Sequence, residues 1–444
     1  MFRNPEPATV GDLASPAPVL PFTTPARGDA GTGRSALDRI VVLDILRGIA
    51  LLGMFVVHFN YYEATPLGVE PGRMAAFLER VLGLFFEERF HGIFGMLFGV
   101  GFAVQLERAD ARGRPFLARY LRRLAALAVF GFIAEGIFGY NVLFGYAMWG
   151  VPLLLVRRWP VTALIILTVF CAAARPIYSI TQVAIASRSP GGVEQLNART
   201  TAQMAAFRAA RDSLRAAQES GSWKTVVAAR IAHMPKFHRQ WSFLPTGSFP
   251  LFLLGLIAWR LGLFTSPDKH RRMILALAIG GAASSALAMF VLPFGGSIAP
   301  PPPSEQNVWT AIAVFARVGF HLFREQWLAF SYIGIILLLV SRNPGWLQRL
   351  SALGWAGQMA LTNYMMQVIL VDLLFTPHGL GLKIPAPLVF PAAIALFVAQ
   401  VFLSRWWLSR FSHGPLEWIW RSVTNWSPQP LRVAPAVLAP RLAA

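Results

Sequence analysis

Three ionisable side chains, Asp44, Arg47 and His58, lie inside one apolar run at residues 40–60, IVVLDILRGIALLGMFVVHFN. At 100° per residue, the step from Arg47 to His58 returns to within about 20° of the same helix face, roughly 16 Å further along the axis. Asp44 precedes Arg47 by three residues and shares that face. Because charged groups are costly inside a membrane and usually mark a site, the run predicts a polar stripe on a membrane helix.

Each side chain of the stripe suits a chemical role and also has a structural interpretation. Histidine as a residue type titrates near neutral pH, so His58 could act as a general base, whereas the structural interpretation is a histidine at the membrane interface. The guanidinium of Arg47 suits the phosphates of an anionic ligand. Its alternative is an ion pair with Asp44 that tolerates burial. The residues alone leave both interpretations open.

The composition indicates the class of protein that carries this stripe. Of 444 residues, 55% are hydrophobic and 14% are charged, with a mean hydropathy of +0.51, which favours a polytopic membrane protein over a soluble domain. The net charge of +19 comes from arginines in short links between apolar runs, so membrane topology explains it and we expect no nucleic-acid partner. The single cysteine, Cys171, excludes an internal disulfide and a cysteine-based metal cluster, and we expect neither a metal nor a bound cofactor.

We predict an all-α bundle of about ten membrane-spanning helices. The apolar runs that define them are 40–60, 90–106, 119–139, 141–157, 160–180, 247–264, 272–292, 326–341, 352–375 and 386–408. The arginine-rich links then fall on one side of the bundle. By the positive-inside rule, both termini are predicted to be cytoplasmic.

Three segments lie outside the predicted spans of a membrane domain at 39–426. Residues 1–38 and 427–444 are rich in proline and alanine, and we expect disordered tails. The link at about 181–246 falls on the extracytoplasmic side and contains the helical pattern AQMAAFRAARDSLRAA, which has a basic face. We interpret this link as a solvated helical loop, and the alternative is a cap over the bundle.

Other polar side chains are predicted at membrane depth. They are Glu135, Asn141, Arg175, Asn363, Gln367 and Asp372. Asn363 and Gln367 are one turn apart and can face the bundle interior together. Hydrogen bonding between helices explains each of these residues without any chemistry.

Two charged segments are predicted to lie at the membrane surface. The segment VFARVGFHLFREQW, before the run at 326–341, is too charged to span and predicts an interfacial helix. Near the end of the chain, a Gly414-Pro415 break precedes Glu417 and Arg421, which are one turn apart. This spacing predicts a short in-plane helix held by a salt bridge.

The chain resembles the YeiB-like family of bacterial membrane proteins, catalogued as a domain of unknown function. The resemblance lies in LDILRGIALLGMFVVHF, FHGIFGMLFGVGFA, and GQMALTNYMMQ with HGPLEWIWR, which bracket residues 39–426. That family is similar to transmembrane acyltransferases, which move an acyl group from cytoplasmic acyl-CoA to an acceptor. The resemblance therefore implies a multi-pass protein of the bacterial inner membrane, with membrane lipids as partners.

The resemblance also implies roles for particular residues. In part of the acyltransferase group, an arginine is followed after ten residues by a histidine in the first span, and Arg47 with His58 matches that spacing. Arg47, beside Asp44, would hold the anionic end of the donor, and His58 would activate the acceptor hydroxyl or amine. Glu135 and Asn141 stand where the acyltransferase pattern has a histidine and a Gly-Asp pair. We expect these two residues, together with Asn363 and Gln367, to contact substrate.

Three functions stay open from the sequence. The first is an acyltransferase that uses acyl-CoA as donor and an envelope or lipid-linked acceptor. The second is a small-molecule transporter or permease, which the intramembrane charges favour and the lack of visible repeats weakens. The third is a non-catalytic membrane protein of the same fold. The enzyme requires His58 and Arg47 to line one cavity open to the cytoplasm, with a carboxylate or amide within hydrogen-bond reach of His58.

Overall fold

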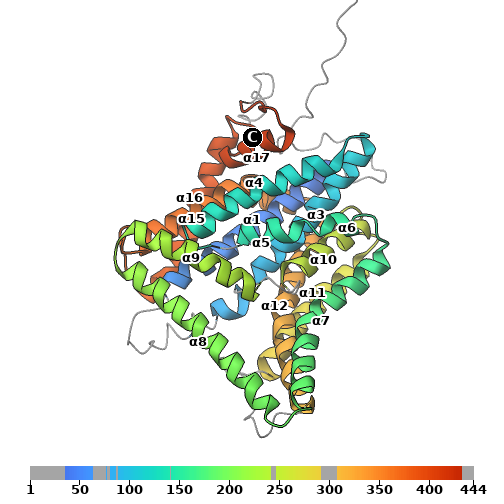
Figure 1. Ribbon diagram of the computed structural model, residues 1–444. Helices are drawn as coiled ribbons and strands as arrows, with labels where there is room; N and C mark the ends of the chain where they lie inside the picture. The colour runs from blue at the N-terminus through green and yellow to red at the C-terminus, as the bar shows by residue number, and fades with distance from the viewer. Residues whose placement is uncertain are drawn as a thin grey trace, which may run out of the picture.

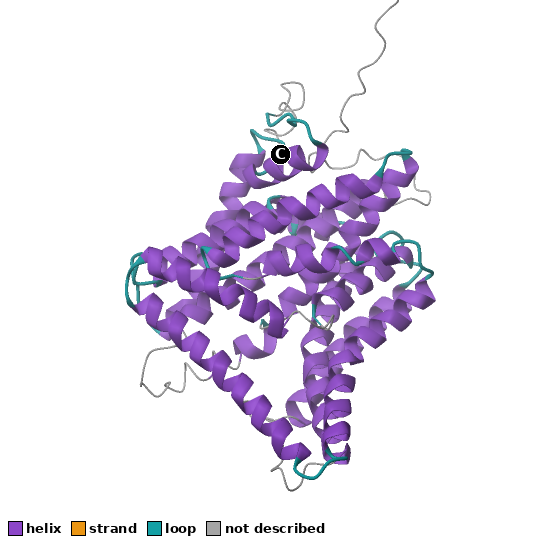
Figure 2. Ribbon diagram, in the orientation of Figure 1, coloured by secondary structure: helices purple, strands orange, loops and turns teal. Residues whose placement is uncertain are grey.

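A computed structural model describes residues 36–63, 77, 81–86, 89–140, 142–241, 247–291 and 308–432. Regular structure throughout this part of the chain is helical, apart from one isolated bridge between Phe411 and Arg432 (Figure 2). The all-α prediction is therefore confirmed. Of the predicted tail at 1–38, only 36–38 fall within the described residues, and the first helix begins there.

Each predicted apolar run contains helix, but the run 141–157 is divided into two short helices, and further helices lie between the runs. In chain order (Figure 1) the helices are α1 Ala36–Glu63, α3 Arg89–Ala111, α4 Phe116–Gly136, α5 Val142–Gly150, α6 Leu153–Val156, α7 Val161–Ala186, α8 Gly192–Glu219, α9 Trp223–Trp241, α10 Ser248–Arg260, α11 Arg271–Val291, α12 Val308–Arg342, α13 Gly345–Arg349, α14 Ser351–Gln358, α15 Ala360–Phe375, α16 Ala386–Leu408 and α17 Pro415–Asn425. α12 joins the predicted interfacial segment and the following span into one continuous helix, so the segment is helical as predicted and its place at the membrane surface stays a prediction.

Several of these helices are apolar enough to lie in a membrane. Within the described residues, the segments Val41–Phe59, Val81–Ala111 and Pro387–Leu408 are long enough to cross a bilayer, and the bent pair α14–α15 would make a fourth span. Shorter apolar helices occur at Val161–Ala174, Ser248–Arg260 and Gln326–Arg342. These helices support a membrane protein, whereas the total of ten spans and the cytoplasmic termini stay predictions.

The predicted span at 352–375 is broken into α14 and α15, which meet at an angle of 81°. The residue before α15, Met359, provides no side-chain cap for its first N–H groups. Glu417 of α17 supplies the missing acceptors: Oε1 accepts hydrogen bonds from the N–H groups of Leu361 (2.6 Å) and Thr362 (3.0 Å), and Oε2 accepts one from the Thr362 hydroxyl (2.5 Å). A helix start needs such acceptors and favours negative charge. The short C-terminal helix is confirmed, but its carboxylate caps α15 instead of forming the predicted salt bridge with Arg421.

Glycines allow α1 and α3 to pack closely against their neighbours. A Cβ atom at Gly357 of α14 would lie 1.8 Å from the carbonyl oxygen of Asp44 in α1. A Cβ atom at Gly99 of α3 would lie 2.0 Å from the carbonyl oxygen of Phe252 in α10. No side chain fits at such separations, so these helices are in backbone contact, as small residues permit in membrane bundles.

The link at 181–246 forms two helices that differ in environment. α8 is largely exposed, whereas α9 packs against α4 and buries Val226, Arg230 and Met234 (Figure 1). The solvated-loop interpretation therefore describes α8 and was wrong for α9, which covers the bundle. The basic pattern that suggested a loop lies on α8, whereas Arg230 of α9 has its partner, Asp372, 142 residues away in the chain.

The end of the described chain folds back onto α17. The Ser412 N–H donates a hydrogen bond to the Leu431 carbonyl (2.8 Å), and the Trp418 indole donates one to the Gln429 carbonyl (2.6 Å). Residues 427–432, which the sequence analysis placed in the disordered tail, thus contact the preceding segment. The rest of that predicted tail lies outside the described residues.

Candidate functional site

The polar stripe of α1 begins with an ion pair. Arg47 Nη1 lies 2.6 Å from Asp44 Oδ1, and the exposed fractions of the two side chains are 31% and 10%. The close contact between α1 and α14 buries Asp44, while the Arg47 guanidinium keeps an accessible edge. The structural interpretation of Arg47 as a partner of Asp44 is confirmed, and the accessible edge leaves donors available for a ligand.

His58, near the other end of α1, faces the bundle interior. Its ring centroid lies 4.4 Å from that of Tyr140 and 6.1 Å from that of Tyr364 in α15. We call these three residues the His58 cluster. Among the described residues, His58 Nδ1 and the Tyr364 hydroxyl are buried atoms that have no hydrogen-bond partner. Such unpaired atoms cost free energy, so the cluster offers a donor and an acceptor that a bound molecule could use.

Glu135 lies beside this cluster and has a partner from the link helix α9. Its Oε2 atom lies 2.8 Å from His238 Nε2, with 7% and 14% of the respective side chains exposed. The Glu135 carboxylate is within electrostatic range of the Tyr364 hydroxyl. His238 and Tyr364 could not be assigned to a site from the sequence, because no local pattern connects residues 135, 238 and 364.

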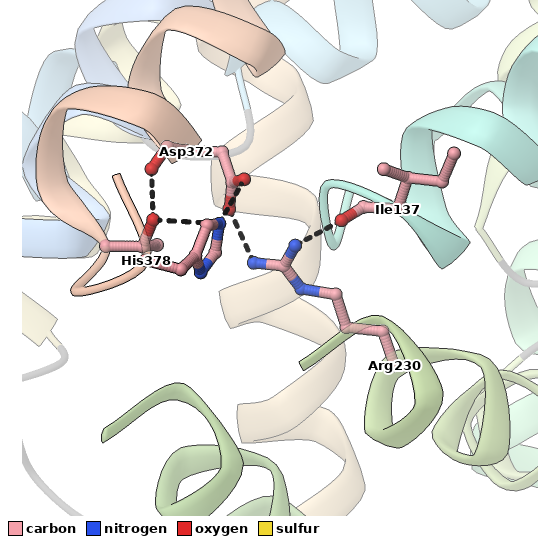
Figure 3. A network of polar contacts seen from close by, with 5 residues as sticks. Ile137, Arg230, Asp372 and His378 are labelled. Carbon is pink, nitrogen blue, oxygen red and sulfur yellow. Dashed lines mark hydrogen bonds and ion pairs between the residues drawn. The ribbon is translucent and has the colours of Figure 1, made fainter. Parts of the chain in front are cut away.

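A second polar network also ties α9 to the bundle (Figure 3). Arg230 Nη2 lies 2.6 Å from Asp372 Oδ1, and His378 Nε2 lies 2.9 Å from Asp372 Oδ2. The Arg230 guanidinium also donates a hydrogen bond to the Ile137 carbonyl. No more than 2% of any of these charged side chains is exposed. A signal for Arg230 exists in the sequence: it occupies an apolar helix face, four residues from both Val226 and Met234.

The other predicted substrate-binding residues lie elsewhere. Asn363 donates hydrogen bonds to Ala356 O (3.0 Å) and Ser404 Oγ (2.9 Å), and Gln367 donates one to Gln400 Oε1 (2.9 Å). They share a face, as predicted, and join α15 to α14 and α16. Their role in substrate binding stays a prediction. Asn141 and the side chain of Arg175 lie outside the described residues.

The enzyme hypothesis requires a cavity lined by His58 and Arg47. The two best-formed hollows of the described part are lined by apolar side chains of α3, α10, α11 and α12, and neither His58 nor Arg47 lines them. The described aromatic rings that contact the His58 ring are tyrosines, in tilted and edge-on arrangements, and no carboxylate or amide of the described residues bonds to its Nδ1 atom.

Two family models match this chain. Residues 39–200 match the catalytic region of heparan-alpha-glucosaminide N-acetyltransferase, and residues 258–427 match a protein of unknown function (DUF418). The first match covers the whole of α1 beyond its first turn and thus both Arg47 and His58. No solved structure matches the chain.

Curated bacterial relatives extend the likeness to most of the chain. The uncharacterized protein YxaH of Bacillus subtilis (strain 168) is 31% identical over 423 residues, which cover 89% of this chain and 96% of that protein. An uncharacterized 39.9 kDa protein from the amylase 3′ region of Bacillus acidopullulyticus is 28% identical over 401 residues, which cover 88% and 95%. The uncharacterized protein YeiB of Escherichia coli (strain K12) is 36% identical over 73 residues, which cover 16% and 19%. The chain therefore belongs to the YeiB-like family of bacterial membrane proteins, which is related to transmembrane acyltransferases.

Proposed function

We propose that this protein is an integral membrane acyltransferase, which moves an acyl group from cytoplasmic acyl-CoA to an envelope or lipid-linked acceptor. In the proposed topology the chain crosses the inner membrane about ten times and both termini are cytoplasmic. Arg47 then lies toward the cytoplasm, and His58 lies toward the outer face.

The observation that carries this proposal is the unpaired Nδ1 of His58 beside the unpaired Tyr364 hydroxyl. A general base needs a free nitrogen that an acceptor can reach, and a hydroxyl donor nearby can hold the oxygen on which negative charge develops. The likeness of residues 39–200 to an acetyltransferase catalytic region supports the same assignment.

The proposed reaction uses the two ends of the α1 stripe differently. Arg47 binds the anionic end of the donor, and Asp44 holds the guanidinium in place through their ion pair. His58 takes the proton from the acceptor hydroxyl or amine as its oxygen or nitrogen attacks the thioester carbonyl. The new acyl bond forms, the carbon–sulfur bond breaks, and the thiolate leaves with the proton that His58 returns. The Tyr364 hydroxyl donates a hydrogen bond to the carbonyl oxygen.

The test replaces His58 with alanine and measures acyl products. Membranes that contain equal amounts of wild-type or His58→Ala protein are incubated with isotope-labelled acetyl-CoA and a lipid and glycan extract of the host. Mass spectrometry then quantifies acylated products. We expect the variant to lose product by about 100- to 10,000-fold, the range for removal of a general base.

His270→Ala is the matched control, because His270 follows α10 and lies outside the His58 cluster. It should keep wild-type turnover. Equal product from wild-type and His58→Ala membranes would refute the mechanism. A labelled product in cells that lack the gene would show that another enzyme makes it.

A transporter is the second candidate, and one observation favours it. The buried contacts of Asp372 with Arg230 and His378 place ionisable groups deep in a membrane bundle, where proton and ion pathways commonly use them. Counterflow measurements on proteoliposomes that contain the purified protein discriminate the two functions. Solute uptake that is unaffected by His58→Ala would favour transport over acyl transfer.

A further inference from the structure

Four arginines converge where α17 lies against α4. They are Arg47 of α1, Arg108 of α3, Arg123 of α4 and Arg421 of α17, and we call them the arginine cluster because their charges interact beside the contact of α17 with α4. The charge of Arg421 interacts with those of Arg108 and Arg47, and the charge of Arg123 interacts with those of Arg47 and Arg421. Four elements that are distant in sequence thus bring like charges together, which costs free energy unless an anion compensates them.

The two carboxylates near the cluster are already occupied. Asp44 pairs with Arg47, and Glu417 accepts the hydrogen bonds that cap α15. Four positive charges therefore face two negative ones, of which Asp44 pairs with a single arginine of the cluster and Glu417 is used by α15. The imbalance leaves a positive field at this end of the bundle.

The guanidinium donors of the cluster are largely unused. Within the described part of the chain, Arg108, Arg123 and Arg421 make no side-chain hydrogen bond or ion pair. Their neighbour Arg122, in contrast, donates a hydrogen bond to the Thr424 carbonyl (3.1 Å). Arg108 and Arg421 are exposed, so their donors can be reached from outside.

α17 is held firmly enough to position Arg421. The Trp420 indole donates a hydrogen bond to the Arg123 carbonyl (2.8 Å), and the Arg123 guanidinium lies 3.9 Å from the centroid of the Trp420 ring. Stacking of this kind fixes the plane of a guanidinium and leaves its edge free for hydrogen bonds. The docked α17 therefore brings Arg421, the residue after Trp420, within range of the charges of Arg47 and Arg123.

We propose that the arginine cluster is a phosphate-binding site that α17 completes, and that it takes a ligand with a diphosphate or phosphodiester group. Guanidinium groups bind such oxygens in pairs and match their charge. The identification of this ligand with the donor of acyl transfer rests on the proposed function, whereas binding of phosphate by the cluster does not. A soluble phosphorylated compound and an anionic lipid headgroup share this chemistry.

The test measures binding to the full-length protein in nanodiscs of phosphatidylcholine. Calorimetric titration uses two soluble probes, inorganic pyrophosphate and free coenzyme A. A separate sample in nanodiscs that contain phosphatidylglycerol, without soluble anion, reports on headgroup binding through the melting temperature. We expect Arg123→Gln and Arg421→Gln to weaken binding by about 10- to 100-fold each, the effect of losing a hydrogen bond to a charged group.

Arg112→Gln is the matched control. Arg112 is exposed just beyond α3 and is not part of the arginine cluster, so this substitution removes the same charge at another position. Arg421→Lys replaces Arg421→Gln in the test if Arg421→Gln does not fold. It keeps the charge but loses the planar fork, so it should bind the probes several-fold more weakly than the wild type. Binding of the soluble probes supports a soluble ligand, and stabilisation by phosphatidylglycerol alone supports a lipid headgroup.

The proposal would be overturned if the wild type bound neither soluble probe and was not stabilised by phosphatidylglycerol. It would also be overturned if Arg112→Gln weakened binding as much as the cluster variants do. The proposed function fails separately. Normal pyrophosphate binding together with normal product from His58→Ala would refute acyl transfer by His58 but keep the phosphate site. Loss of binding in Arg421→Gln with full acyl transfer would refute only the role of the cluster in holding the donor.

Discussion

The buried pair of Arg230 and Asp372 provides a quantitative test of how α9 is held. The two side chains are 2% and 1% exposed and their charged atoms are 2.6 Å apart, so neither charge is solvated by water. Arg230→Gln leaves the Asp372 charge buried with only His378 beside it. Removal of one partner of a buried pair costs about 3–5 kcal/mol, because the remaining charge is uncompensated.

A double-mutant cycle separates this pairing from other effects of the substitutions. The free energy of unfolding is measured for the wild type, Arg230→Gln, Asp372→Asn and the double variant by titration of denaturing detergent into mixed micelles, followed by circular dichroism. The double variant buries no unpaired charge, so it should lose less than the sum of the single variants. We expect a coupling energy of about 1–3 kcal/mol.

Arg215→Gln is the control, because Arg215 and Glu219 are 3.3 Å apart but 44% and 59% exposed on α8. An exposed pair of this kind contributes little, so this variant should unfold like the wild type. A coupling energy below about 0.5 kcal/mol between Arg230 and Asp372 would contradict the reasoning. Apolar packing of α9 would then explain its position.

Three further predictions concern the break between α14 and α15 and the segment that follows α16. Gly357→Ala should lower the melting temperature because its Cβ atom would meet the Asp44 carbonyl at 1.8 Å, whereas Gly145→Ala has open space and should be neutral or stabilising. Glu417→Ala should increase hydrogen exchange at Leu361 and Thr362, which lose their acceptor, and unchanged protection would contradict the cap. Burial and the positive charge of Arg421 lower the pKa of His413 to about 4. Docking of residues 411–432 should therefore be fully stable above pH 6.5 and weaken as the pH falls toward 4, and hydrogen exchange of His413→Asn should lack this dependence.

The helices and part of the site could be predicted because their signals are local. Apolar runs of spanning length marked the segments that form α1, α3, α4, α7, α10, α11 and α16. Helical periodicity placed Asp44 and Arg47 on one face, where they form their ion pair. The same rule placed Asn363 and Gln367 together on the face that joins α15 to its neighbours. These inferences needed only residues within a few turns of one another.

Contacts between distant residues could not be predicted from such patterns. Arg230 and Asp372 are 142 residues apart, and Glu135 and His238 are 103 apart, so only packing reveals that α9 belongs to the bundle. Glu417 has Arg421 one turn away, yet its carboxylate caps α15, because the N–H groups at the 81° break need acceptors more than an exposed arginine needs a partner.

The sequence by itself determined that this is a helical membrane protein and that Asp44, Arg47 and His58 lie along one helix. Length, hydrophobicity and helical period are sufficient for both conclusions, since they depend on the bilayer and on the geometry of a single helix. Only the tertiary structure decided what surrounds His58 and which arginines gather near Arg47. A buried polar group is stabilised by whichever partner packing brings within hydrogen-bond distance, and that partner can come from any part of the chain.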